Sequence, residues 1–208
     1  MKTKALLFIN GTPPKQLPDI SPETMVACTD GAYHYLKKML DIERIDFISG
    51  DWDSYAGVQD IPEEVRRKMI YTPDQDFTDF YKALDILKAK GIREVVVYGG
   101  SGGEQDHFLG NLSVAYRFRA VMDIVFEDEY AQYFFIPPFF EIQGVKGKMI
   151  SLYPFPKAEG ITTQGLQWQL NDGVLDITER IGTRNRAIEN KITIEYRCGA
   201  LLIFIGKT

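Results

Sequence analysis

The stretch REVVVYGGSGGEQDHFLGN, residues 93–111, combines three structural signals in one short segment. Residues 93–99 form an apolar, β-branched run with the length of a buried strand that ends at a glycine. Three more glycines follow within four residues, and apolar residues then recur at helical spacing. A strand that passes through a short turn into a helix is the repeating unit of α/β proteins. The segment therefore predicts a mostly parallel sheet with helices packed on it.

The same alternation extends over roughly the first 130 residues. Short apolar runs typical of buried strands lie at 5–9, 24–28, 45–49 and 122–126. Helices are expected at 32–40, 62–70, 78–91 and 106–118, where apolar residues recur at helical spacing or a proline occupies the first turn. Strands buried on both faces that alternate with helices indicate an α/β domain, which we place at residues 1–132.

The pattern changes after this point, because prolines cluster and no segment has a convincing helical period. Short strands are expected at 148–155, 161–170, 173–179, 191–197 and 200–206. The last two flank Cys198 and Gly199, which predicts a hairpin. A small all-β domain is therefore expected at residues 133–208.

Composition and charge narrow the classes of partner. The chain has 208 residues and a net charge of −5, without a basic stripe, so nucleic acid is not expected as a partner. If the substrate is a polyphosphate, something other than net charge must attract it, and a divalent cation is the obvious candidate.

Cys28 and Cys198 are far apart and are expected to be reduced, buried thiols. No apolar run has the length of a membrane span or a signal-peptide core, so a cytoplasmic protein is expected.

Carboxylates follow two of the expected strands. Asp30 comes after the second strand, and Asp51 and Asp53 come after the third. Ligands of open parallel sheets bind outside the carboxyl ends of the strands. Residues two apart in extended chain point the same way, roughly 6–7 Å apart, and a magnesium ion relieves the repulsion between such carboxylates. The alternatives are that Asp30 is a helix N-cap and that Asp51 and Asp53 belong to an acidic surface turn capped by Ser54.

The stretch TPDQDFTDFYKAL crowds polar side chains at the start of a helix. Taken singly, these residues have structural explanations, because Asp76 or Thr78 can cap the helix and Asp79 and Lys82 can form a solvated ion pair. Their density counts against this interpretation and favours a site. The polar side chains concerned are Asp74, Gln75, Asp76, Thr78 and Asp79.

The glycine-rich loop lets backbone amides approach an anion, and the helix N-terminus that follows favours phosphate. The loop matches neither GxGxxG nor GxxxxGK[ST]. Asp106 is alternatively a helix cap, and His107 is expected to be a first-turn histidine facing the sheet rather than a metal ligand. The glycines are Gly99, Gly100, Gly102 and Gly103.

Six segments, taken in order, resemble the thiamine pyrophosphokinase family. TDGAYHYL, SGDWDS, TPDQDFTDFYKAL and GGSGGEQDHFLGN are similar to that family's Asp-Gly-Gly, Gly-Asp-Phe-Asp-Ser, Pro-Asp-Gln-Asp-x-Thr-Asp-Phe and Gly-Gly…Asp-His segments. Farther along, ITTQGLQWQL is similar to its Thr-Thr-x-Gly-Leu-x-Trp segment, and GTRN lies where the family has a Ser-x-Ser-Asn-like loop. The resemblance spans 30–111 and 161–185.

The resemblance implies a Rossmann-like, nucleotide-binding α/β domain followed by a β-sandwich that binds thiamine. It implies a homodimer with the vitamin near the subunit interface. The implied reaction transfers a diphosphate from ATP to the hydroxyl of thiamine, with Mg²⁺ as cofactor, and yields thiamine diphosphate and AMP.

The resemblance also implies roles for individual residues. Asp51, Asp53 and Asp79 would hold Mg²⁺ and form the catalytic set together with Asp30. Thiamine would contact Trp168, Thr183 and Asn185, although the alternating pattern around Trp168 is by itself more typical of a core residue. The nucleotide would contact Gln75, Asp76, Thr78, Gly99, Gly100, Gly102, Gly103, Asp106 and Asn111.

Three positions depart from the family pattern. Ala32 replaces the second glycine of Asp-Gly-Gly, Glu104 replaces an arginine after the glycine pair, and Arg184 replaces a small hydroxyl residue. Two other functions remain open on the sequence. One is a Mg²⁺-dependent phosphohydrolase of nucleotides or pyrophosphate, and the other is a relative that binds thiamine or nucleotide without turnover.

Overall fold

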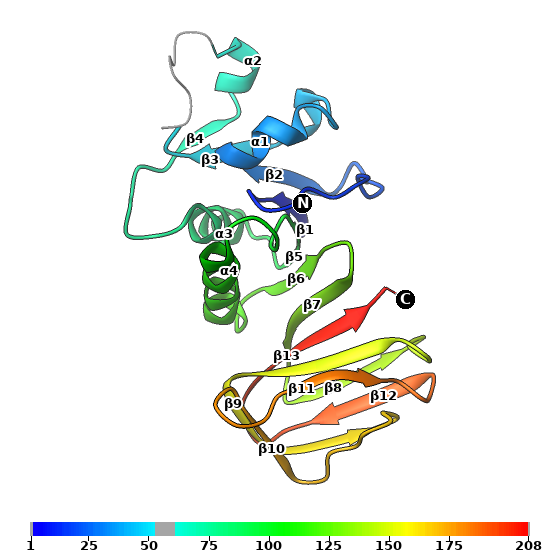
Figure 1. The fold of residues 1–208 in the computed structure, drawn as a ribbon. Coiled ribbons are helices and arrows are strands. Elements are labelled where there is room, and N and C mark those ends of the chain that lie inside the picture. The colour runs from blue at the N-terminus through cyan, green and yellow to red at the C-terminus, as the bar shows by residue number, and fades with distance from the viewer. Residues whose placement is uncertain (1, 53–60, 208) are drawn as a thin grey trace. The chain divides into compact units, whose positions relative to one another are not determined.

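The computed structural model describes residues 2–52 and 61–207 (Figure 1). The chain divides into two compact units, Met1–Asp128 and Glu129–Thr208. Both helices and strands are present, so the mixed α/β class expected from the sequence is confirmed. Among the described residues, no helix combines the length and the apolar character needed to cross a membrane.

Unit 1, Met1–Asp128, contains a parallel sheet. Its strands follow one another in the order β4-β3-β2-β1-β5-β6, and every neighbouring pair is parallel. The apolar runs at 5–9, 24–28, 45–49, 93–99 and 122–126 all became strands, as predicted. The strands are β1 Lys4–Phe8, β2 Met25–Thr29, β3 Phe47–Gly50, β4 Met69–Tyr71, β5 Glu94–Tyr98 and β6 Asp123–Glu127.

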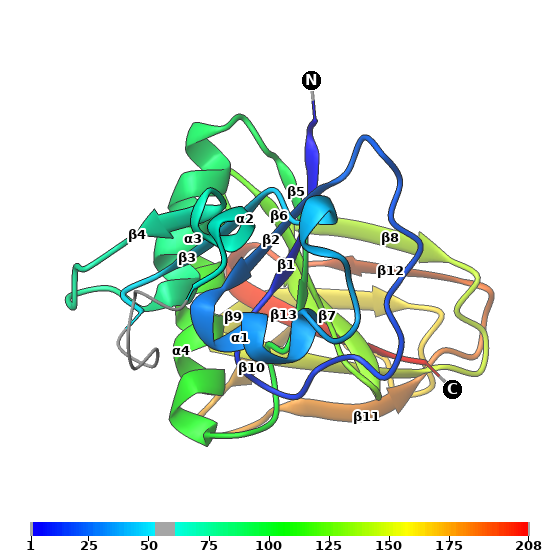
Figure 2. The same ribbon diagram turned by 90° about the horizontal axis from the view of Figure 1, so that it is seen from above.

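Four α-helices and one 3₁₀ turn lie in the described part of unit 1, residues 2–52 and 61–128. Helices α3 and α4 lie side by side, as Figures 1 and 2 both show, and α1 packs on β1, β2 and β3. The helix expected at 62–70 is shorter than predicted, because its last residues enter β4. The elements are α1 Asp30–Leu36, η1 Ile42–Arg44, α2 Glu63–Arg66, α3 Asp79–Ala89 and α4 Gln105–Phe118.

The order of the strands reverses at β1. The chain adds β2, β3 and β4 on one side of β1 and then returns to add β5 and β6 on the other side. Beyond the ends of β1 and β5, the amide of Gly11 donates to the carbonyl of Gly99 over 2.9 Å. The carboxyl ends of β1 and β5 thus flank the topological switch point, where parallel sheets bind their ligands.

Alternate residues of the strands cover the two faces of this sheet. Leu6, Phe8 and Val26 pack with Leu36 of α1 in one buried cluster. The periodic face of α3 is buried as predicted, and the ring of its Phe80 lies 5.7 Å from that of Phe126. On α4, Leu109 belongs to the apolar residues that recur at helical spacing in 106–118, but its side chain is 62% exposed.

Unit 2, Glu129–Thr208, contains strands and turns, and its described residues include no helix. All its strand pairs are antiparallel, in the order β7-β13-β9-β12-β8, with β10 and β11 also paired to β9. The strands are β7 Ala131–Ile136, β8 Phe139–Gln143, β9 Met149–Gln164, β10 Gly173–Asp176, β11 Gly182–Arg186, β12 Lys191–Glu195 and β13 Cys198–Gly206.

The long strand β9 organises unit 2. Its first part, Ile150–Glu159, pairs with β13, and its last residues, Thr162–Gln164, pair with β12. Two stretches that the sequence separated, 148–155 and the start of 161–170, are therefore one strand. The remainder of the second stretch, including Trp168, lies outside any strand.

The hairpin expected around Cys198 and Gly199 is wrong. Strands β12 and β13 pair with opposite parts of β9 and not with each other. Gly199 instead allows the backbone of β13 to pass close to that of β9, since a Cβ atom at this position would lie 2.0 Å from the carbonyl oxygen of Lys157. The prediction for the cysteines is also half wrong. Both are free, and Cys28 is buried, but Cys198 is exposed.

Candidate functional site

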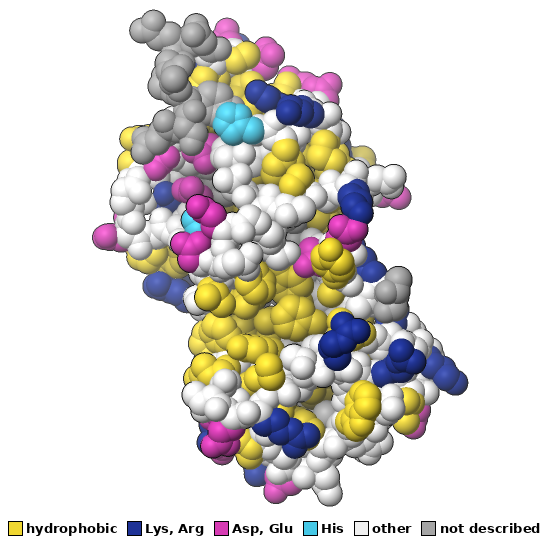
Figure 3. Space-filling view, in the orientation of Figure 1, with side chains coloured by type: hydrophobic (Ala, Val, Ile, Leu, Met, Phe, Trp, Pro, Cys, Tyr) yellow, Lys and Arg dark blue, Asp and Glu magenta, His cyan; other side chains and the backbone are white. Residues whose placement is uncertain are grey.

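A cavity of about 770 Å³ lies at the carboxyl ends of the strands of unit 1. It is lined by the segments after β1, β2, β3 and β5, by the start of α3 and by the start of α4. Acidic side chains gather over this part of unit 1 in the space-filling view (Figure 3). The sequence-predicted residues that line it are Asp30, Asp51, Gln75, Asp76, Thr78, Asp79, Gly99, Gly102, Gly103, Asp106 and Asn111.

Asp30 is the most buried carboxylate of the cavity, at 6% exposure. It is the first residue of α1 rather than the N-cap, and its two oxygens accept from the amides of Gly31 at 2.7 Å and Trp52 at 3.0 Å. Gly50 makes room for it, because a Cβ atom there would lie 2.2 Å from Asp30 Cγ. A residue with a side chain at position 50 would therefore collide with the Asp30 carboxyl group.

The environment of Asp30 works against its ionisation. Burial raises the pKa of this carboxyl, and the charges of Asp79 and Asp51 raise it further, while the two amide hydrogen bonds act in the opposite direction. Asp30, Asp51 and Asp79 all line this one cavity. Asp53, which the sequence assigned to the same set, lies outside the described residues, as does Ser54.

Asp51 is held by the segment before α3. One of its oxygens accepts a hydrogen bond of 2.8 Å from Gln75 Nε2. In the same segment, the amide of Asp76 donates to Asp74 Oδ1 at 2.8 Å, which tightens the turn. Gln75 is therefore bonded to a carboxylate of the cavity.

Thr78 is the N-cap of α3, one of the two capping residues that the sequence allowed. Its hydroxyl accepts from the amide of Tyr81 at 3.3 Å, and Asp79 follows in the first turn. The sequence allowed a solvated ion pair between Asp79 and Lys82. The pair forms, but the prediction of solvation is wrong for Lys82, whose side chain is only 10% exposed. Lys82 Nζ lies 2.8 Å from Asp79 Oδ1 and donates to the carbonyls of Thr72 and Asp74 at 2.8 and 3.1 Å.

The glycine-rich loop adopts conformations that suit glycine. Gly99, Gly102 and Gly103 have φ angles of +77°, +78° and +74°, and all three line the cavity. Gly100 does not line it, and its carbonyl accepts from Asn111 Nδ2 at 3.0 Å. Asn111 on α4 thus fixes the loop through Gly100.

The residues at the start of α4 are exposed. Glu104 is the N-cap, and Asp106 bonds the amide of His107 at 2.9 Å rather than capping the helix. His107 does not face the sheet as expected, since its side chain is 67% exposed and its Nε2 lies 3.5 Å from Glu104. One ligand atom from each of Glu104, Asp106 and His107 lies within 4.8 Å of the others.

Two groups of cavity residues were missed in the sequence. Asn10 and Gly11 line the cavity directly after β1, and Lys82 lines it from α3. The available signal for Asn10 was its position after an apolar run, which is the same rule that identified Asp30. For Lys82 no sequence signal distinguished a buried ion pair from a solvated one.

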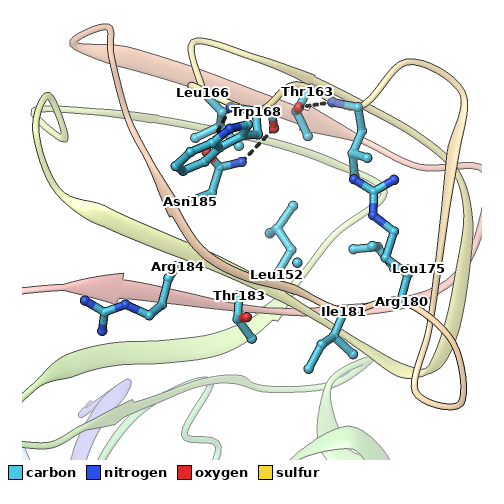
Figure 4. A pocket seen from close by; sticks show the side chains of 12 residues that line it. Leu152, Thr163, Leu166, Trp168, Leu175, Arg180, Ile181, Thr183, Arg184 and Asn185 are labelled. Atoms are coloured by element: carbon cyan, nitrogen blue, oxygen red, sulfur yellow. Dashed lines mark hydrogen bonds between the residues drawn. The ribbon is translucent and has the colours of Figure 1, made fainter.

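A second pocket, of about 340 Å³, lies within unit 2. Figure 4 shows that Trp168 and Asn185 border one side of it and that Leu175 and Arg180 border the opposite side. Three leucines that line it, Leu152, Leu166 and Leu175, are buried. Trp168 is 59% exposed, so the more typical interpretation of this residue as core is wrong.

Asn185 holds the chain segment that carries Trp168. Its Oδ1 accepts from the amides of Trp168 at 3.1 Å and Arg186 at 2.8 Å, and its Nδ2 donates to the carbonyl of Trp168 at 2.7 Å (Figure 4). A side chain with bonds to both backbone groups of one residue positions that residue. The indole is thus supported without being part of a strand.

Thr183 and Arg184 lie at an irregularity of β11, where the register to β9 shifts between Gly182 and Asn185. Arg184 has a φ of +56°, and its amide donates to the buried Ser151 hydroxyl at 2.9 Å. The pocket lining includes Arg180 and Arg184 but no described Asp or Glu. An acidic lining would suit a positively charged ring, and the described lining of this pocket does not provide one.

Comparison with known sequences identifies the family. Residues 19–126 match the family described as "Thiamin pyrophosphokinase, catalytic domain", and residues 140–201 match "Thiamin pyrophosphokinase, vitamin B1 binding domain". The chain belongs to the thiamin pyrophosphokinase family, as the sequence motifs suggested.

Curated relatives agree with this assignment. The chain is 31% identical over 165 residues to "Thiamine pyrophosphokinase 1" of Arabidopsis thaliana, a match that covers 72% of this chain and 61% of that protein. It is 27% identical over 166 residues to "Thiamine pyrophosphokinase" of Bacillus subtilis, covering 74% and 75% of the two chains. The match to the Oryza sativa protein likewise spans 61% of that relative, at 28% identity.

Solved structures share the fold. The thiamine pyrophosphokinase of Bacillus subtilis aligns with a TM-score of 0.78 at 22% identity, covering 97% of this chain and 98% of that one. The thiamin pyrophosphokinase of Candida albicans aligns with a TM-score of 0.79 at 14% identity, covering 99% and 89%. The chain therefore shares the fold of these solved structures.

Proposed function

We propose that this protein transfers a diphosphate group from ATP to the hydroxyl of thiamine, giving thiamine diphosphate and AMP. The observation that carries the proposal is the convergence of Asp30, Asp51 and Asp79 on one cavity at the switch point of a parallel sheet. In the reaction, the hydroxyl oxygen of thiamine forms a bond to the β-phosphorus, and the O–H bond breaks with release of the proton to solvent. The bond from that phosphorus to the oxygen bridging to the α-phosphate breaks, and AMP leaves with this oxygen.

The proposed nucleotide site uses backbone more than side chains. The loop of Gly99, Gly102 and Gly103 and the N-terminus of the 14-residue helix α4 offer amide hydrogens to phosphate oxygens. Asn111 keeps this loop in place through the carbonyl of Gly100. Gln75, Asp76, Thr78 and Asp106 line the same cavity and are proposed to contact or orient the nucleotide.

The residues of the cavity fit a magnesium ion. Mg²⁺ prefers carboxylate and water oxygens, and the charges of Asp51 and Asp79 together with burial disfavour an ionised Asp30 unless a cation is near. We assign Asp51 and Asp79, with Asp53 from outside the described residues, as the groups that would hold it. The bound ion would neutralise phosphate charge in an otherwise acidic site. Lys82 holds Asp79 in place and tethers the preceding loop.

Unit 2 is proposed to receive the vitamin. The indole of Trp168 offers a face to a positively charged ring, and Thr183 offers a hydroxyl at the rim. Asn185, proposed from the sequence to contact thiamine, has the more direct task of holding Trp168. We propose the division 1–132 and 133–208, with a Rossmann-like nucleotide-binding domain and a β-sandwich, in a cytoplasmic homodimer.

An assay of AMP release with MgATP, in the presence and absence of thiamine, tests the proposal. Diphosphate transfer predicts AMP formation that depends on thiamine and matches thiamine diphosphate one for one. Release of phosphate or pyrophosphate without thiamine would instead indicate the phosphohydrolase. Thiamine binding in calorimetry without any AMP would indicate the relative that binds without turnover.

A further inference from the structure

The pocket of unit 2 combines an apolar floor with a cationic rim. Leu152, Leu166 and Leu175 supply buried apolar surface, and Trp168 supplies an aromatic wall. The charged side chains that line the pocket are those of Arg180 and Arg184. In Figure 4 Arg180 runs along one side of the pocket, and Arg184 extends from β11 at the other end.

Neither guanidinium has an ion-pair or hydrogen-bond partner among residues 2–52 and 61–207. Two other exposed cations of the same unit are paired, Lys157 with Glu159 and Lys191 with Glu141, at 2.6 and 2.5 Å. The positive charges of Arg180 and Arg184 are therefore available to a ligand of the pocket.

The backbone fixes where the Arg184 side chain begins. Arg184 holds a left-handed φ of +56°, which a non-glycine residue adopts only with support from its surroundings. The support comes from its amide, which donates over 2.9 Å to Ser151, a hydroxyl-bearing residue that is 8% exposed. A fixed origin at the rim limits the conformational freedom that a guanidinium loses on binding.

These charges disfavour one form of the vitamin and favour another. Thiamine carries a positive ring, which two unpaired guanidiniums repel and which no carboxylate of this pocket attracts. A phosphate ester of thiamine adds negative oxygens that match the fork of a guanidinium, while its rings keep the same contacts with Trp168 and the leucines.

We propose that this pocket binds the phosphate esters of thiamine in preference to thiamine, with Arg180 and Arg184 as the residues that set the preference. The inference rests on the proposed function for the identity of the vitamin, and it goes further by assigning a charge preference to the pocket. The product of the proposed reaction then binds unit 2 more tightly than the acceptor does.

Calorimetric titration of the full-length protein without metal and nucleotide measures the preference directly. The probes are thiamine, thiamine monophosphate, thiamine diphosphate and AMP. At low salt we expect the dissociation constant of thiamine diphosphate to be at least about tenfold smaller than that of thiamine. Because exposed charges are screened, we expect this ratio to shrink as ionic strength rises toward about 1 M.

Three variants test the residues. Arg180→Gln and Arg184→Gln each should reduce the ratio, and the double variant should bring it close to one with thiamine affinity unchanged or higher. Arg186→Gln is the matched control, because Arg186 is an exposed residue of the same strand β11 that does not line the pocket. It removes the same charge and should leave the ratio unchanged.

Equal or tighter binding of thiamine by the unmodified protein would overturn the proposal, as would a preference that survives in the double variant. Binding of AMP as tight as that of thiamine diphosphate would also overturn it, since the pocket would then be a nucleotide subsite. If the double variant does not fold, the single variants and the salt dependence still decide. The AMP-release assay is independent of these titrations, so failure of diphosphate transfer is distinguishable from failure of the charge preference.

Discussion

The cavity of unit 1 and the pocket of unit 2 are lined by side chains of opposite charge. The cavity of unit 1 is formed by strand ends and helix starts and is dominated by carboxylates, glycine backbone and one nearly buried lysine. The pocket of unit 2 is formed by the side chains of an antiparallel sheet and its connections, and it presents leucines, an indole and two arginines. Carboxylates are confined to the first lining and unpaired arginines to the second.

This difference indicates a division of labour. Oxygen ligands and backbone amides suit a metal ion and phosphates, whose chemistry depends on positioning and charge neutralisation. An aromatic wall over an apolar floor suits recognition of a flat organic ligand. Substitutions in unit 1 should therefore reduce the rate of reaction, and substitutions in unit 2 should mainly change affinity for the vitamin.

The largest expected effect is that of Asp79→Asn. Loss of a carboxylate that is proposed to hold Mg²⁺ should remove several kcal/mol of charge stabilisation, so we expect kcat to fall on the order of 10³-fold. Asp51→Asn should lower kcat to a similar extent. It should keep the local structure, because its amide oxygen can still accept the hydrogen bond from Gln75. Turnover is measured as AMP release with saturating thiamine and MgATP.

Asp85→Asn is the control for this prediction. It lies on the same helix α3, is exposed and does not line the cavity, so turnover should stay within about twofold of the unmodified protein. Near-normal turnover of a folded Asp79→Asn protein would contradict the proposal that the cavity of unit 1 carries out the reaction.

A smaller effect is expected for Trp168→Ala. The indole is 59% exposed, so the variant should fold normally, but it loses the aromatic wall of the pocket. We expect the KM for thiamine to rise roughly tenfold to thirtyfold with little change in kcat. Ile188→Ala removes another exposed apolar side chain of unit 2, outside the pocket, and should change neither constant. A selective fall in kcat for Trp168→Ala would contradict the division of labour.

Lys82→Met should destabilise unit 1 moderately. Lys82 joins Asp79 to the carbonyls of Thr72 and Asp74, and its loss leaves these groups without a donor. We expect the free energy of unfolding, measured in urea, to fall by about 1–3 kcal/mol. The exposed Lys88 of the same helix gives the matched variant Lys88→Met, for which a change within about 0.5 kcal/mol is expected. Equal stabilities of the two variants would show that the contacts of Lys82 with Asp79, Thr72 and Asp74 do not stabilise unit 1.

The smallest expected effect is the pH dependence contributed by Asp30. Burial, with Asp79 and Asp51, raises the pKa of this carboxyl in the folded protein. The folded state therefore holds the proton to higher pH than the unfolded state, and this contribution to stability is present at low pH and lost as pH rises through the folded pKa.

The comparison of Asp30→Asn with the unmodified protein isolates this contribution. In metal-free urea titrations from about pH 4 to pH 7, the unmodified protein should lose stability relative to Asp30→Asn as pH rises. Magnesium should reverse part of this loss, because a cation favours the ionised carboxylate. A difference in stability that does not vary with pH would mean that the raised pKa of Asp30 is absent.

The sequence predicted the parallel half of the fold well for a physical reason. Strands buried on both faces, such as 93–99, stand out as continuous apolar runs, and the glycines and Asp-rich turns that follow them mark their ends. The same rule would have identified Asn10 after the first strand. Residues of the cavity of unit 1 were predictable because strand ends and the switch point follow from element order.

The antiparallel half was less predictable, because pairing is long-range. Strands β7 and β8 were not predicted, and many of their residues are only partly buried or exposed. Strands β12 and β13 were expected to pair with each other, but both pair with β9. Trp168 and Asn185 are far enough apart in the sequence that their backbone bonds could not be anticipated. Whether Lys82 was buried or solvated likewise depended on the path of residues 72–74.

The central claim is that an intact diphosphate passes from ATP to thiamine in a site built on Asp51 and Asp79. Phosphorus NMR of a reaction with MgATP and thiamine tests this most directly, since it identifies each product. We predict that AMP and thiamine diphosphate accumulate in equal amounts and that neither forms with Asp79→Asn at a comparable rate. Accumulation of free phosphate or pyrophosphate without thiamine diphosphate, or undiminished product with Asp79→Asn, would contradict the claim.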